Sequence, residues 1–61
     1  MKSERLKNAR MACGFSQDEV VERLAARGHN VTKASISNYE KGKREPNALT
    51  LRELAEVYDV S

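Results

Sequence analysis

The sequence predicts an all-α domain of four short helices, and two observations support this fold class. Apolar residues recur at helical spacing in four stretches, and no stretch alternates apolar and polar residues as a half-buried strand does. Each stretch begins at a residue that favours a helix N-cap, and a glycine follows three of them. The expected helices cover about residues 3–13, 17–27, 33–41 and 47–58, within a single domain of residues 1–61.

The first expected helix has Ser3 as its N-cap and Gly14 as its stop. Cys13 is the only cysteine, so it has no partner for an internal disulfide, which agrees with a reducing compartment. Together with the only histidine, His29, it is too little for a structural zinc site. A Cys–His nucleophile pair is formally possible, but the helical spacing predicts a buried core thiol. The inward face is expected to hold Leu6, Ala9, Arg10 and Cys13.

The second expected helix has the clearest start in the chain. Ser16 is its N-cap, and Glu19 stands three residues further on, where it completes a capping box. Phe15 before the cap and Val20 inside the helix are placed as a hydrophobic staple, and Gly28 is the expected stop. The inward face is expected to hold Val20, Val21, Leu24 and Ala25.

The third expected helix is short and carries little apolar surface. Thr32 is its N-cap, and Val31 and Ile36 again stand in staple positions. Ile36 and Tyr39 are expected to point inward, and Gly42 ends the helix.

The fourth expected helix follows Pro46, which cannot continue a helix and pushes Glu45 toward an extended conformation. Asn47 is a good N-cap. Ser61 would suit the start of another helix, so we expect the chain to be a fragment or part of a longer protein. The inward face is expected to hold Leu51, Leu54, Ala55 and Tyr58.

The length and composition favour a binding module. A chain of 61 residues buries only about 60% of its unfolded surface, which argues against an enzyme with a deep pocket. No apolar run approaches the roughly 20 residues that cross a bilayer, and no signal peptide is visible, so we expect a cytoplasmic protein without a membrane partner. No pattern indicates a nucleophile–base pair, a metal or a cofactor.

The net charge of +2 is a weak indication of nucleic-acid binding, but its distribution is informative. Basic residues surround the third expected helix, while acidic residues gather on the second and fourth. A solvated mixed surface is the alternative interpretation. The basic group is Lys33, Lys41, Lys43 and Arg44, and the acidic groups are Asp18, Glu19 and Glu22, and Glu53, Glu56 and Asp59.

Taken together, these segments resemble the Cro/repressor (XRE-type) helix-turn-helix family of phage and bacterial regulators. The resemblance implies a compact domain of the lambdoid-repressor type, with a recognition helix over 33–41 and a fifth helix that this chain lacks. The stretch between Leu24 and Ile36 is several residues longer than usual, which predicts either a longer second helix or an enlarged turn. The matching segments are residues 6–10, 15–20 and 36–43, then Pro46, Leu51, Leu54 and Ala55.

The resemblance also implies roles for individual residues. Lysine can donate to guanine acceptors and asparagine can pair with adenine, whereas a helix N-terminus and a basic turn suit phosphates. The residues implied to read bases are Lys33, Ala34, Ser35 and Asn38. Those implied to contact the DNA backbone are Gln17, Thr32, Ser37, Lys41, Gly42, Lys43 and Arg44. The alternatives are a solvent-facing Gln17, a Ser37 bonded to its own helix, a solvated basic turn and a Gly42 that only stops the helix.

Arg10 stands on an apolar face, where an unpaired charge is unfavourable. The family has a salt bridge at the positions that match Arg10 and Glu40, and we therefore expect this pair to tie the recognition helix to the first helix.

The expected function is sequence-specific binding of a double-stranded DNA operator, as the DNA-binding domain of a transcriptional regulator and most often a repressor. A homodimer is expected for the full-length protein. The alternative is a protein-interaction module, such as an antitoxin-like or protease-regulated regulator, because the fold alone does not guarantee DNA binding.

Overall fold

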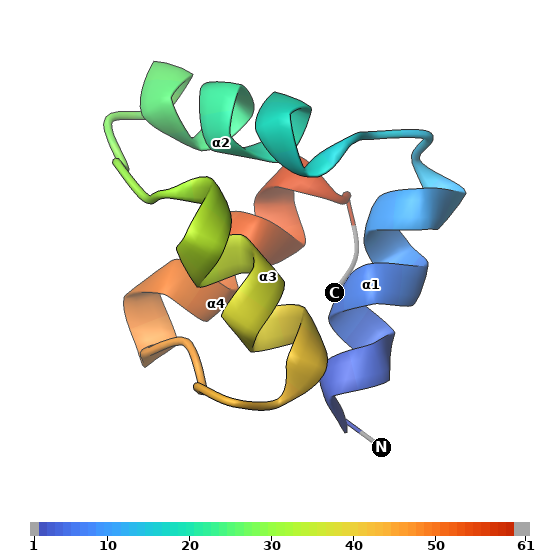
Figure 1. Ribbon diagram of the computed structural model, residues 1–61. Coiled ribbons are helices and arrows are strands. Elements are labelled where there is room, and N and C mark those ends of the chain that lie inside the picture. Colours follow the sequence, from blue (N-terminus) through green and yellow to red (C-terminus); the bar gives the residue numbers. More distant parts are fainter. Residues whose placement is uncertain (1, 60–61) are drawn as a thin grey trace.

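The computed structural model describes residues 2–59, which form four helices and no strand. The helices are α1 (Lys2–Ala12), α2 (Gln17–Ala26), α3 (Lys33–Lys41) and α4 (Ala48–Val57). Figure 1 shows α2 lying across one end of the molecule, α1 standing at one side, and α3 in front of α4. The expected all-α fold is confirmed. Because α1 begins at Lys2, however, Ser3 lies inside this helix and is not its cap.

Side-chain caps start the other three helices where the sequence predicted them. Ser16 Oγ accepts the amide of Glu19 at 3.1 Å, and the Ser16 amide donates to Glu19 Oε1 at 2.8 Å, so the capping box of α2 is complete. Thr32 Oγ1 accepts the amide of Ser35 at 3.0 Å in α3, and Asn47 caps α4 in the same manner. These bonds satisfy amides that a helix leaves unpaired, so the helix starts are encoded locally.

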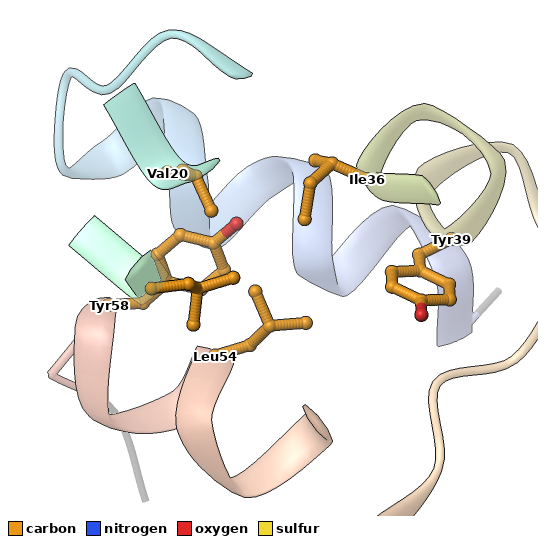
Figure 2. Packing of buried hydrophobic residues seen from close by; sticks show 6 residues of the cluster. Val20, Ile36, Tyr39, Leu54 and Tyr58 are labelled. Carbon is orange, nitrogen blue, oxygen red and sulfur yellow. The ribbon is translucent and has the colours of Figure 1, made fainter. Parts of the chain in front are cut away.

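The core is formed by apolar side chains from α2, α3 and α4. Figure 2 shows Val20, Ile36, Leu54 and Tyr58 converging, with Tyr39 at the edge of the group. The helix α1 contributes only partly buried side chains, and the staple residues Phe15 and Val31 cover the margins as expected. The buried hydrophobic residues within the described range are Val20, Leu24, Ile36, Tyr39, Leu54 and Tyr58.

Three residues expected in the core are exposed instead. Cys13 lies beyond the last residue of α1, so it leaves the helical face and only its Sγ reaches the Tyr58 carbonyl, at 3.4 Å. Ala25 is exposed on α2, and Leu51 is 48% exposed on α4. On α4, Leu54 is buried as expected, and the other buried residue is Thr50, which the sequence did not indicate. The buried face of α4 therefore extends toward Thr50 and leaves Leu51 outside.

The longer stretch between α2 and α3 forms an enlarged turn, and α2 is not extended. The turn covers residues 27–32 and begins at the C-cap Arg27. Its first part folds back on α2, because the His29 amide donates to the Leu24 carbonyl at 2.9 Å. Gly28 follows Arg27 in a left-handed conformation, with φ at 82°.

Charged and polar groups attach this turn to α4. Arg27 Nε donates to Glu53 Oε1 at 2.6 Å, and the same guanidinium also binds Glu56. His29 Nε2 lies 2.9 Å from Oγ1 of Thr50, a buried residue of α4. The hydrogen bond from Arg27 lowers the pKa of Glu53. These contacts therefore fix the enlarged turn, which leads into α3, against α4.

The burial of Tyr58 predicts a loss of stability in alkaline solution. Burial, and then the nearby Glu40 carboxylate, raise the pKa of Tyr58 from 10.0 to about 12. Between these pH values the unfolded chain loses the phenolic proton while the folded chain keeps it. The contribution of Tyr58 to the free energy of unfolding is therefore fully present below pH 10. It decreases as the pH rises toward 12.

Denaturant unfolding of wild type and Tyr58→Phe between pH 9 and pH 12 checks this expectation, because the substitution removes the titrating group. The decline in the free energy of unfolding should be less steep in Tyr58→Phe. Equal slopes for the two proteins would contradict a raised pKa of Tyr58.

Candidate nucleic-acid interface

The helix α3 turns one side to the core and leaves the other side accessible. Ile36 and Tyr39 are buried, whereas Lys33 and Ala34 are exposed and Asn38 is half-buried. Ala34 and the three residues at the following helical spacings lie on one stripe. This α3 stripe consists of Ala34, Ser37, Asn38 and Lys41.

The hydroxyl groups at the start of α3 already have partners. Thr32 Oγ1 donates to Ser35 Oγ at 3.0 Å while it accepts the Ser35 amide. The two side chains therefore define the first turn of the helix. A contact of Thr32 with a phosphate, or of Ser35 with a base, stays a prediction.

The turn after α3 presents cationic side chains and directs its amides back to the helix. Gly42 has φ at 75°, a left-handed conformation that a glycine adopts without strain. Its amide, expected to face a phosphate, donates to the Tyr39 carbonyl at 3.3 Å, and the Lys43 amide donates to the Asn38 carbonyl at 3.0 Å. The Lys43 and Arg44 side chains are exposed, and neither takes part in an ion pair within residues 2–59.

Arg10, Gln17 and Glu40 form a partly buried hydrogen-bonded cluster, hereafter the Glu40 cluster. Arg10 Nε lies 2.6 Å from Glu40 Oε2, and Arg10 Nη2 lies 3.1 Å from Glu40 Oε1. Gln17 Nε2 donates to Glu40 Oε1 at 3.0 Å. Arg10 Nη1 also donates to the Phe15 carbonyl at 2.9 Å, so one guanidinium joins α1, the following turn and α3.

The Glu40 cluster is largely withdrawn from solvent, because the side chains of Arg10 and Glu40 are only 13% and 6% exposed. The hydrogen bond to the Glu40 carboxylate raises the pKa of Arg10 although burial opposes the charge. The ion pair expected between these residues is present. Its effect on the orientation of α3 stays a prediction.

The contact of Gln17 with a phosphate stays a prediction, but the structure gives its side chain a second role. Its amide nitrogen is bonded to Glu40, so the side chain is part of the scaffold in this structure. The cluster nevertheless forms the floor of a surface pocket, and two lysines stand at its rim. The pocket is lined by Lys7, Arg10, Gln17, Ser37, Glu40 and Lys41.

Lys7 is a candidate interface residue that the sequence did not indicate. It lies on α1, three residues before Arg10, and it lines the same pocket as Lys41 from α3. The spacing to Arg10 would have placed Lys7 on the side of α1 that faces α3. Only the packing of α1 against α3 shows that the two lysines share one pocket, and their charges can together attract an anion there.

Lys33 has a carboxylate partner on the preceding helix. Lys33 Nζ lies 3.7 Å from Asp18 Oδ2, and the two side chains are 62% and 71% exposed. Both residues stand in the first turns of their helices, so the pair bridges α2 and α3 on the outside of the molecule.

The remaining charges divide the described surface into two parts. On α4, Glu53 and Glu56 are engaged by Arg27, and Arg52 lies 3.7 Å from Glu56, so this acidic group is largely compensated. The α3 stripe is instead bordered by lysine and arginine side chains without carboxylate partners. Such a surface can bind the phosphates of a polyanion and present short polar side chains to base edges.

Two further classes of site find no support in residues 2–59. None of these helices combines the length and the apolar character that a bilayer span requires. No three His, Cys, Asp or Glu side chains within this range gather closely enough to hold a metal ion.

Comparison with known proteins yields one family and two relatives. A family profile described as helix-turn-helix matches residues 6–61. The HTH-type transcriptional regulator ImmR of Bacillus subtilis (strain 168) is 40% identical over 58 residues, which are 95% of this chain and 42% of that protein. The SPbeta prophage-derived uncharacterized HTH-type transcriptional regulator YonR of the same organism is 36% identical over 61 residues, which are 100% of this chain and 52% of that protein. The chain thus spans about half the length of these relatives, and no solved structure shows a significant match.

Proposed function

The chain belongs to the helix-turn-helix family, and on this premise we propose that it is the sequence-specific DNA-binding domain of a transcriptional regulator. The resemblance seen in the sequence is thereby confirmed at the level of the family. The relatives that carry the name transcriptional regulator support the regulatory part of the proposal. A protein of this kind acts on DNA in the cytoplasm of a bacterial cell, and we propose repression by occupation of an operator.

The accessible α3 stripe, followed along the chain by the unpaired cations Lys43 and Arg44, is the observation that carries the proposal. Asn38 has no side-chain hydrogen bond within the described residues, so its amide is free to pair with a base. An α-helix fits the major groove of B-DNA, where asparagine can pair with adenine and lysine with guanine. The exposed side chains of Lys43 and Arg44 follow directly after α3, at a position suited to the flanking phosphates.

A dimeric form is part of the proposal for the whole protein. Two copies of α3 would then enter successive major grooves about 34–36 Å apart, and the operator would be a palindrome or nearly so. Specificity would come from α3, and much of the affinity from phosphates.

Selection of bound duplexes from a random-sequence pool tests the proposal directly. We expect wild type to enrich one half-site, and Asn38→Ala and Lys33→Ala each to lower the affinity for the enriched duplex about 10- to 100-fold. Each variant should lose preference at one base pair and not at the others. Fluorescence anisotropy with the enriched duplex, repeated at two salt concentrations, measures the affinities.

Asn8→Ala is the matched control, because Asn8 is an exposed asparagine of α1 outside the α3 stripe. Its affinity should equal that of wild type. A wild-type protein that binds no duplex even at low salt would overturn the proposal and would favour a protein-interaction module.

A further inference from the structure

We infer that Asp18 is a specificity-determining residue. Together with Lys33 it forms a donor–acceptor pair that fits the major-groove edge of a G·C base pair. Its carboxylate also weakens the binding of Lys33 to a phosphate. The inference rests on the proposed function and deepens it. In the free protein the carboxylate holds Lys33. On a G·C pair, Lys33 donates to guanine O6 while Asp18 accepts from the cytosine N4 amino group.

The geometry of the pair suits such an exchange. The 3.7 Å between Lys33 Nζ and Asp18 Oδ2 exceeds the length of a hydrogen bond, and both side chains are mostly exposed. An exposed ion pair of this kind contributes little free energy, so Lys33 can exchange Asp18 for a base at a small energetic cost. The two side chains come from the first turns of α2 and α3, which are the helices that a helix-turn-helix domain sets against DNA.

The negative charge of Asp18 makes Lys33 discriminate between a base and a phosphate. A phosphate that approaches Lys33 brings a full negative charge next to the carboxylate, whereas guanine O6 is a neutral acceptor and brings only a partial one. Asp18 also stands in the first turn of α2, where the helix amides would otherwise attract anions. The carboxylate therefore weakens the contact of Lys33 with a phosphate more than its contact with a base.

A comparison with the other cations of the interface supports this assignment. Lys41, Lys43 and Arg44 are exposed and have no carboxylate partner within the described residues. These side chains can bind any phosphate of a duplex, whatever its sequence. Among the basic residues of α3 and the turn that follows it, Lys33 alone is paired with an acid in the part of the chain that the structure describes.

Asp18→Asn tests the inference, because it removes the charge and keeps the shape. On a duplex without the enriched site, we expect the affinity at low salt to rise about threefold, with the log–log salt slope steeper by about 0.9 as Lys33 engages a phosphate. Affinity for the enriched duplex should change less than twofold, so the ratio of specific to non-specific binding falls. The preference for G·C at one position should weaken.

Two further variants isolate the mechanism. Asp59→Asn removes the same charge at an exposed residue outside α2 and α3, and asparagine tolerates the positive φ of 57° at this position. It should leave the ratio of specific to non-specific binding unchanged. In the double variant Asp18→Asn with Lys33→Ala, the gain on non-specific DNA should disappear, because the gain requires the lysine.

The outcomes distinguish this inference from the proposed function. If wild type enriches a site but Asp18→Asn behaves like Asp59→Asn, or keeps its gain without Lys33, the role of Asp18 is wrong and the proposed function stands. If wild type binds no duplex at all, both are wrong.

Discussion

Glu40→Gln is expected to lower the free energy of unfolding by about 3 kcal/mol, the largest effect that we anticipate for a single charged residue. Three donors converge on the Glu40 carboxylate, two from Arg10 and one from Gln17. A glutamine in this place offers one acceptor oxygen, and its NH₂ group then faces one of the Arg10 donors. The guanidinium is left mostly buried with a poorer partner. The estimate is at the lower end of the range for a broken buried pair, because Arg10 stays 13% exposed.

The same substitution should also weaken DNA binding. A domain of this size has a free energy of unfolding of only about 3–9 kcal/mol, so the loss is a large fraction of the total. In the molecules that remain folded, the hydrogen bonds of the Glu40 cluster, which connect α1, α2 and α3, are weaker. The α3 stripe is then less well oriented for the major groove.

Chemical denaturation followed by circular dichroism gives the change in unfolding free energy. Glu53→Gln is the matched control, since it makes the same chemical change in the more exposed pair with Arg27, and its effect should be much smaller. Equal unfolding midpoints for wild type and Glu40→Gln would show that the Glu40 cluster does not hold the helices together.

Replacement of Lys41, Lys43 and Arg44 by alanine is expected to lower the affinity for the enriched duplex about 500-fold at about 0.1 M salt. Each phosphate contact contributes about −0.9 to the log–log slope of affinity against salt, so three contacts contribute about −2.7. On this linear dependence the free energy gained from counterion release extrapolates to zero at about 1 M salt, so the difference in affinity between wild type and the triple variant should disappear there. The base preference should persist, because the α3 residues that read bases are unchanged.

A titration of affinity over a range of salt concentrations measures the slope for wild type, the triple variant and each single variant. Arg52→Ala is the control, because it removes a positive charge from α4, where Arg52 is 76% exposed and lies near Glu56. Its slope should match that of wild type. If the triple variant keeps the wild-type slope, these side chains do not contact phosphates.

The candidate interface was only partly visible in the sequence. The sequence pointed to the basic turn and to the accessible side of α3, since the glycine stop, the proline and the helical spacing are all local signals. It could not indicate that the Gln17 amide is bonded to Glu40, nor that Lys7 joins Lys41 in one pocket. Both facts depend on how helices that are far apart in the chain pack against one another.

The errors in the predicted core have the same origin. Leu51 and Leu54 are equally apolar, and both lie at plausible helical spacing, yet only Leu54 is buried. The rotation of α4 about its axis is set by its contacts with α2 and with the enlarged turn, including the bond between Thr50 and His29. A segment's own spacing does not decide which of the neighbouring residues Thr50 and Leu51 lies on the buried side, although they stand about 100° apart on the helix.

By itself, the sequence determined the number of helices, the capped starts of α2, α3 and α4, and the family. Those features come from bonds between residues three or four positions apart, such as the Ser16–Glu19 capping box, and such bonds form whatever the rest of the chain does. The family resemblance indicated the pair of Arg10 with Glu40, but only the tertiary structure decided the pairs of Arg27 with Glu53 and of Lys33 with Asp18. An ion pair between distant residues exists only after packing has brought two helices together, and many such pairings are compatible with one sequence.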